Sequence, residues 1–204
     1  MPESRGKYHH GDLRAALIAT GLELTRSGGP EALRLREVTG LVGVSPNAAY
    51  RHFTNHQALL AAVAAEIQDR MAGRMNAHDP SDESTDSRDR ALGRLRAVGL
   101  GYVGFAVDEP GWFQLAFFTP QRITRPDGQA PPPLKLLHQA LDALVDAGVL
   151  MPARRPGAEW SCWSTVHGFA ELATHGPLRG EPRQIMLGHA ERVVDDIITG
   201  VINT

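Results

Sequence analysis

The sequence predicts an all-α fold, with a small helix-turn-helix head at the N-terminus and a larger helical domain after it. Apolar residues recur at helical spacing along most of the 204 residues. No run of alternating β-branched residues is long enough to suggest a strand. Two polar or proline-rich stretches, 77–89 and 119–133, interrupt the helical pattern and predict loops.

Composition limits the class of protein. The only cysteine is Cys162, so no disulfide can form within the chain. The N-terminus has no apolar signal region, and no stretch of about 18 apolar residues occurs, so we expect a cytoplasmic protein with no membrane partner. Residues 1–60 hold seven Lys or Arg against five Asp or Glu, whereas the whole chain has net charge −2. A weakly basic N-terminal part is typical of a small nucleic-acid-binding head, although chance asymmetry would look the same.

Two helices open the head. The first is predicted to begin after Asp12, whose carboxylate suits an N-cap, and to end at 27–30, where Ser-Gly-Gly-Pro breaks the pattern. The second is predicted over 35–42. Its apolar residues Val38, Leu41 and Val42 are expected to face the core.

A tight turn and a third helix follow. Gly43 can adopt the positive φ that the turn needs, Ser45 suits an N-cap, and Pro46 suits a first turn. The third helix is predicted over 46–53, with Pro46, Ala49 and Phe53 facing inward. Together, the second and third helices have the dimensions of a helix-turn-helix.

The fourth helix is predicted to start at a capping box and to run to Met75. In this interpretation Thr54 is the N-cap and the Gln57 side chain reaches back to its N–H.

The outer face of the third helix suits the major groove of DNA. Asn47 and Arg51 carry groups that bond adenine and guanine edges. Tyr50, His52 and His56 are better placed for phosphate oxygens. The alternative is an ordinary solvated helix face.

Residues 9–63 resemble the DNA-binding domain of the tetracycline repressor (TetR) family, through the run GVS, then YRHF, then ALL. The resemblance implies a dimeric, usually repressing, transcription regulator with a C-terminal domain that binds a small effector. It also implies DNA contacts from Arg36, Ser45, Asn47, Tyr50 and His52. Where the family commonly has Lys, this chain has His56. With the arm and turn residues added, the predicted DNA-binding set is Lys7, Arg36, Ser45, Pro46, Asn47, Ala48, Tyr50, Arg51, His52 and His56.

Two other site patterns fail. His52 and His56, with His9 and His10 nearby in the sequence, suggest a metal, but Thr54 interrupts the helix between the first two and no further ligand completes a set. The segment GLGYVG at 99–104 fits a dinucleotide-binding loop, yet charged residues precede it, the helix after it is too short and no ribose acid follows. No metal and no cofactor are therefore expected.

As part of a helix over 87–107, the same glycines form a stripe of small residues. Gly93, Ala97, Gly101 and Gly104 fall on it, beside a bulky stripe that includes Tyr102. Each helical glycine costs on the order of 1 kcal/mol against alanine. Either a neighbouring helix packs very closely there, or a cavity opens for a ligand.

Four more helices are predicted, over 111–118, 133–147, 158–175 and 182–201. The runs WFQLAFF and WSCWSTVHGFAEL resemble a C-terminal domain type of one TetR branch, in which a Trp and a His-Gly recur. An apolar or aromatic effector pocket is expected, although each lining residue would equally suit the core. The predicted pocket residues are Tyr102, Phe105, Trp112, Phe117, Phe118, His138, Trp163 and His167.

The last helix carries two neighbouring apolar stripes, which favours two partners: the core of its own subunit and a second chain. We expect it to pair with its copy in a homodimer, as the resemblance implies, although a final helix buried inside a monomer would look alike. The predicted dimer residues are Met186, Ala190, Val193, Ile197 and Val201. The second stripe comprises Leu187, Val194, Ile198 and Ile202.

We therefore expect a sequence-specific DNA-binding regulator, a repressor that a small, largely apolar effector of unknown identity releases from a palindromic operator. Residues 1–55 would form the DNA-binding domain, 56–76 a connecting helix, and 77–204 the effector-binding and dimerisation domain. One alternative is a helical effector-binding protein or adaptor without DNA binding. Another is an enzyme that uses Cys162 with His167, but five residues on a helix separate these side chains by about 140° and no nucleophile turn occurs. No catalytic residue is expected.

Overall fold

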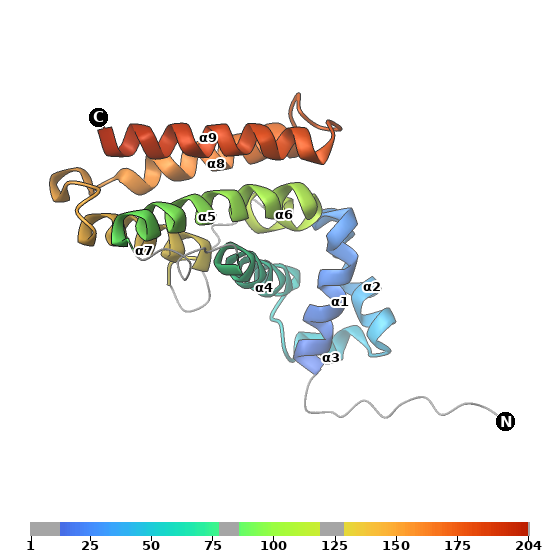
Figure 1. Ribbon diagram of the computed structural model, residues 1–204. Helices are drawn as coiled ribbons and strands as arrows, with labels where there is room; N and C mark the ends of the chain where they lie inside the picture. The colour runs from blue at the N-terminus through green and yellow to red at the C-terminus, as the bar shows by residue number, and fades with distance from the viewer. Residues whose placement is uncertain (1–12, 78–85, 119–128, 204) are drawn as a thin grey trace.

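The computed structural model describes residues 13–77, 86–118 and 129–203, which form α-helices joined by short connections, without a strand among them (Figure 1). The all-α prediction is confirmed. The helices are α1 Leu13–Gly28, α2 Leu35–Val42, α3 Pro46–Tyr50, α4 His56–Ala77, α5 Ser87–Asp108, α6 Pro110–Phe118, α7 Pro132–Asp146, α8 Ala158–Thr174 and α9 Arg183–Asn203. Single turns of 3-10 helix occur at Pro30–Ala32 and Pro152–Arg154. No described helix has the length and apolar character needed to cross a membrane.

Local sequence signals explain the turn between α2 and α3. Gly43 has φ 79°, in the left-handed region that glycine adopts without strain. The Ser45 hydroxyl accepts the N–H of Ala48 at 3.3 Å, and Pro46 opens α3. The side chains of Ala49 and Phe53 are buried, as predicted, and hold the helix pair together.

Three details of the head differ from the prediction. Helix α3 ends at Tyr50 rather than Phe53, because the N–H groups of Arg51 and His52 bond to carbonyls three residues back and tighten the last turn. Pro46 is exposed rather than inward. Leu41 is 64% exposed, so the core face of α2 is narrower than expected.

Helix α4 begins one residue later than the capping box predicted. Asn55, rather than Thr54, is the N-cap, and its Oδ1 accepts the N–H of Ala58 at 2.9 Å. Both residues are good caps, so the sequence alone did not decide between them.

Helix α5 occupies the centre of the larger domain. It packs against α4, α7, α8 and α9 and continues through Glu109 into α6 (Figure 1). The glycines of α5 explain its close packing: a Cβ on Gly101 would lie 2.7 Å from Met75 Cα of α4, and one on Gly99 would lie 3.1 Å from the Val194 methyl groups of α9. Of the two explanations left open, close approach of neighbouring helices holds at these positions.

Candidate DNA-binding face and ligand sites

The outer face of α3 presents the side chains expected of a DNA-reading helix. Asn47, Tyr50, Arg51 and His52 are all exposed, and Tyr50 is 51% exposed. Arg36 is exposed on the adjacent α2. The structure thus brings these side chains to the surface of one helix pair.

The other predicted DNA-binding residues vary in exposure. Ser45 and Pro46 are exposed at the start of α3, whereas Ala48 is half-buried. Lys7 lies outside the described residues, as do the first helix's predicted N-cap Asp12 and the histidines His9 and His10.

His56 does not have the surroundings predicted for a phosphate ligand. Its ring is partly buried, and its Nε2 lies 2.5 Å from the backbone carbonyl of Leu33. Because a carbonyl only accepts, Nε2 carries the proton, and in the neutral ring Nδ1 is then an acceptor that cannot donate to phosphate. His56 therefore ties the start of α4 to the segment before α2, a long-range contact that the sequence did not indicate.

Six of the residues predicted for the effector pocket fall into two groups. Tyr102 of α5 lies at the centre of the first, which we call the aromatic cluster. The Tyr102 ring centroid lies 5.7 Å from the ring centroid of Phe117 of α6 and 5.3 Å from that of Trp163 of α8. His167 of α8 and Phe113 of α6 complete the cluster, with their ring centroids 5.6 Å apart. Phe113 was not among the predicted pocket residues.

A hydrogen bond joins Tyr102 and His167, with Oη and Nδ1 2.7 Å apart. Burial raises the pKa of the Tyr102 hydroxyl well above its usual value. Burial also lowers the pKa of the His167 ring, an effect that Glu171 partly offsets. Both groups are therefore neutral at neutral pH, so the Tyr102 O–H donates to Nδ1 and the ring proton sits on Nε2.

Trp112 and Phe105 form the second group and do not belong to the aromatic cluster. The Trp112 indole N–H donates to the Leu22 carbonyl of α1 at 2.8 Å, and the guanidinium groups of Arg26 and Arg70 lie 5.3 and 5.2 Å from its ring centroid. Phe105 stacks on Trp112 with centroids 6.3 Å apart. Trp112 thus packs against α1, and Phe105 packs on Trp112 and beneath Arg74 of α4, so neither contributes to the aromatic cluster.

The two remaining predicted pocket residues add little to the cluster. The backbone carbonyl of His138 lies 3.5 Å from the guanidinium of Arg155, which also pairs with Asp142 and Glu159. The side chain of Phe118 lies outside what the structure describes.

Gln68 of α4 was not predicted as a site residue. Its side chain is 1% exposed, and neither its Nε2 nor its Oε1 has a hydrogen-bond partner among the described residues. An unpaired buried amide costs about 1 to 3 kcal/mol, so such a group is expected where something supplies its bonds. The signal was available, because Gln68 is a polar residue on a helix face that also holds Ala64 and Met71, both buried.

The head joins the larger domain where α1 ends against the start of α6. Arg26 and Glu109 form a two-pronged ion pair, with N to O distances of 2.6 and 2.8 Å, and Glu109 is 9% exposed. A Cβ on Gly111 would lie 2.5 Å from the Thr25 carbonyl oxygen. The two helix ends therefore meet so closely that only glycine fits at this position.

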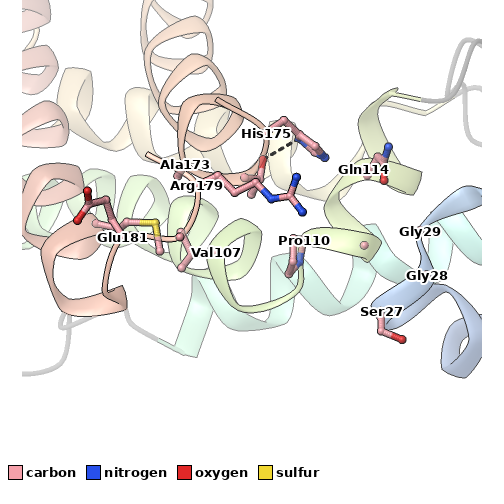
Figure 2. A pocket seen from close by; sticks show the side chains of 14 residues that line it. Ser27, Gly28, Gly29, Val107, Pro110, Gln114, Ala173, His175, Arg179 and Glu181 are labelled. Carbon is pink, nitrogen blue, oxygen red and sulfur yellow. Dashed lines mark hydrogen bonds between the residues drawn. The ribbon is translucent and has the colours of Figure 1, made fainter. Parts of the chain in front are cut away.

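A cavity of about 470 Å³ lies beside this junction (Figure 2). One wall comes from the end of α1 and the start of α6, including Ser27, Gly29 and Gln114. The other comes from the α8–α9 connection, including His175 and Arg179. None of the predicted pocket residues with a described side chain lines it.

Helix α9 does not present the predicted dimer stripe to solvent. Met186, Ala190 and Val201 are buried within the subunit, and Val193 and Ile197 are half-buried. The first three therefore belong to the subunit's own core, which corrects their assignment to the dimer interface. Residues of both predicted stripes are buried within the subunit, since Val194 of the second stripe is also buried, at 1% exposure.

The geometry argues against the enzyme alternative. Cys162 is buried, and burial raises the pKa of its thiol to about 11, so the reactive thiolate is scarce at neutral pH. His167 bonds to Tyr102 through Nδ1. Within the described ranges, no three His, Cys, Asp or Glu side chains gather as a metal site.

Two family profiles match the chain. "Bacterial regulatory proteins, tetR family" matches residues 17–63, which include α2 and α3, and "Tetracyclin repressor-like, C-terminal domain" matches residues 95–197. No curated protein matches the sequence.

Solved structures share the fold over nearly the whole chain. A protein of unknown function from Rhodococcus sp. RHA1 is 26% identical, with 97% of this chain and 99% of that one covered and a TM-score of 0.66. A variant of TetR from Acinetobacter baumannii AYE, in complex with minocycline, is 20% identical, with coverage of 92% and 94% and a TM-score of 0.62. The regulator FadR from Bacillus subtilis, in complex with stearoyl-CoA, is 13% identical, with coverage of 92% and 98% and a TM-score of 0.68.

Proposed function

The chain belongs to the tetracycline repressor family of DNA-binding transcription regulators, and we propose that it acts as a homodimeric repressor that a small, largely apolar effector releases from a palindromic operator. The exposed polar surface of α3 and of the turn that ends it carries this proposal, because Asn47 on α3 and Arg51 at its C-cap are exposed and bear groups that can bond base edges in a major groove. In a dimer, two such helices would enter successive grooves about 34 Å apart. As proposed from the sequence, residues 1–55 bind DNA, 56–76 connect, and 77–204 bind the effector and dimerise.

The direct test is retardation of a DNA fragment that carries a palindrome from upstream of the protein's own gene or a divergent neighbour. We expect the purified dimer to bind it at low salt and to release it as salt rises, because phosphate contacts release counterions. Failure to retard any such fragment at low salt would contradict the proposal.

Base reading and phosphate contact can be separated within α3. Replacing Arg51 with Ala is expected to cost about 1 to 3 kcal/mol and to relax preference at one base position. Replacing Tyr50 with Phe removes one hydroxyl and is expected to weaken binding to all sequences alike. Arg94→Ala, on α5 of the larger domain, is the control that should leave binding unchanged. Identical behaviour of the Arg51 and Tyr50 variants would refute this division of roles.

We propose that the effector binds against the aromatic cluster. Phe117, Trp163 and His167 are each half-buried, so part of each ring remains accessible at the edge of the cluster. The neutral Tyr102–His167 pair offers polar atoms without a charge, and Gln68 offers a buried amide that no described residue bonds. An apolar or aromatic molecule with one or two hydrogen-bonding groups fits this chemistry.

The route from effector to DNA would run through α6. This helix carries Phe113 and Phe117 of the aromatic cluster, and also Gly111 and Trp112, which contact the end of α1. A shift of α6 would therefore reach the head through rigid contacts. The effector would act by binding more tightly to the conformation in which the heads do not fit the operator than to the conformation in which they do.

A comparison of two conservative substitutions tests this site once an effector is found among apolar molecules. Gln68→Leu, which removes the buried amide while keeping its size, should stabilise the free protein and weaken the effector, with operator binding retained. Gln57→Leu, an exposed position in the first turn of α4, is the matched control. Unchanged effector affinity in Gln68→Leu would exclude Gln68 from the site.

A further inference from the structure

We propose that the cavity between the α1–α6 junction and the α8–α9 connection is a second ligand site, for a small anion on an apolar body. Its volume of about 470 Å³ lies within the range of about 300 to 1,000 Å³ that small-molecule sites span. It is separate from the aromatic cluster, whose described members do not line it.

Arg179 supplies the recognition of an anion. Other arginines of the described chain, such as Arg26, Arg74 and Arg183, are held in ion pairs. Arg179 has no ion pair within the parts of the chain that the structure describes, and Figure 2 shows its guanidinium extended between His175 and Pro110. A guanidinium matches a carboxylate or phosphate in shape as well as charge.

The neighbouring polar groups favour the same ligand chemistry. The Gln114 amide and the Ser27 hydroxyl lie on the opposite wall and can donate hydrogen bonds. His175 is held in place by Glu171 and Thr174, at 3.1 and 3.0 Å. Glu181, the one carboxylate among the described lining residues, points away from Arg179 in Figure 2.

Four apolar side chains of the lining favour an organic anion over a bare inorganic ion. These are Val107, Pro110, Ala173 and Met186. A carboxylate on a short hydrocarbon body would bury its apolar part against these side chains while its charge meets Arg179. We therefore expect a carboxylate with an apolar body to bind better than phosphate alone.

The position of the cavity gives the ligand a regulatory effect. One wall belongs to the helix ends that hold the head, and the other to the connection between α8 and α9. A molecule that contacts both walls would fix the head relative to these last two helices. This regulatory effect rests on the proposed DNA-binding function, whereas binding of the ligand to the cavity does not.

Calorimetry on the full chain tests binding with four named probes: hexanoate, benzoate, inorganic phosphate and the uncharged hexanamide. We expect hexanoate or benzoate to bind, and the other two to bind more weakly. Arg179→Gln should weaken the carboxylate about tenfold or more, since it removes a charge-assisted bond. Arg94→Gln, a surface arginine of α5 outside this lining, should leave the affinity unchanged.

Two further variants locate the probe. Ser27→Leu adds bulk on the exposed wall and should block binding, whereas Tyr102→Phe in the aromatic cluster should not change it. The proposal is overturned if no carboxylate binds at millimolar concentration, or if Arg179→Gln and wild type bind it alike. An equal loss in Tyr102→Phe would place the probe in the aromatic cluster instead.

Measuring operator affinity with and without the bound carboxylate tests whether the ligand regulates DNA binding. We expect a change in apparent affinity that Arg179→Gln abolishes. If the carboxylate binds without any change in operator affinity, the regulatory effect is overturned and the ligand site stands. Loss of operator binding in the absence of any probe would instead count against the proposed function.

Discussion

Gly101 and Gly104 stand almost one turn apart on α5 and have opposite surroundings. A Cβ on Gly101 would lie 2.7 Å from the Met75 Cα of α4, which is backbone and cannot rotate away. A Cβ on Gly104 would meet no atom of the described residues within 4 Å, although this residue too is buried. The two positions therefore separate the cost of crowding from the general cost of glycine in a helix.

The first prediction compares Gly101→Ala with Gly104→Ala. We expect Gly101→Ala to lower the free energy of unfolding by about 1 to 3 kcal/mol, because α4 and α5 must move apart. Gly104→Ala should raise it by up to about 1 kcal/mol, because alanine favours the helix and its methyl group has room. Urea unfolding followed by circular dichroism measures both. Equal effects at the two positions would contradict the close approach of α4.

The second prediction concerns His167 and pH. Its folded pKa is lowered from 6.5, so the unfolded chain binds the proton first as the pH falls. The stability that the neutral ring contributes is complete above about pH 6.5 and is lost as the pH drops below that value.

His167→Gln serves as the comparison, because a Gln oxygen can accept the Tyr102 O–H and does not titrate. The difference in unfolding free energy between wild type and variant should shift against wild type between pH 7.5 and 5.5. Every other titratable side chain is present in both proteins, so its contribution to the difference cancels. A difference that stays constant with pH would refute the effect of burial on His167.

At the scale of elements, the sequence predicted the caps and turns that depend on interactions between residues close together in the chain. Ser45 caps α3 and Gly43 turns the chain because each acts on atoms within three residues of itself. Trp112 could not be placed this way, since its partner, the Leu22 carbonyl, lies 90 residues away in the sequence. The same holds for His56 and Leu33, and for Arg179, whose role depends on the cavity that α1, α6 and the α8–α9 connection enclose.

The junction of α1 and α6 gives the third prediction. Trp112→Phe removes the indole N–H bond to Leu22 and weakens the contacts of Arg26 and Arg70 with the ring. We expect a loss of about 1 to 2 kcal/mol in unfolding free energy. Because the lost bond ends on α1, amide hydrogen exchange should rise most in residues 20–28.

Trp160→Phe is the matched control, since Trp160 is 64% exposed on α8 and far from α1 in the chain. It should leave exchange in residues 20–28 unchanged. Uniformly faster exchange over the whole chain in Trp112→Phe would indicate a general loss of stability, and it would contradict a specific tie between head and larger domain.

At the scale of the whole molecule, α8 and α9 lie together along the side remote from the head (Figure 1). Their outer surface is unusually apolar for one that meets solvent: Trp160 and Leu172 of α8 are 64% and 46% exposed, and Ile185 of α9 is 48% exposed. Trp160, Ser164, Gly168 and Leu172 recur at every fourth position and so share one face. A second copy of the chain would cover this face.

The last prediction places the dimer interface on that face of α8, with Gly168 at its centre. A Cβ on Gly168 would meet no described atom of its own subunit within 4 Å, so Gly168→Arg should fold normally. In a dimer, the new charge would be buried against the partner, at a cost of several kcal/mol. Light scattering should then show a monomer at concentrations where wild type is a dimer.

Gly73→Arg is the matched control, because Gly73 of α4 is also exposed, has no atom of the described residues within 4 Å of its Cβ position, and lies away from α8 and α9. It should remain a dimer. Operator binding should weaken in Gly168→Arg and not in Gly73→Arg, because a single head has lost the second half-site. A dimer that survives Gly168→Arg would place the interface on another surface, and a monomeric wild type would remove the geometric basis for a palindromic operator.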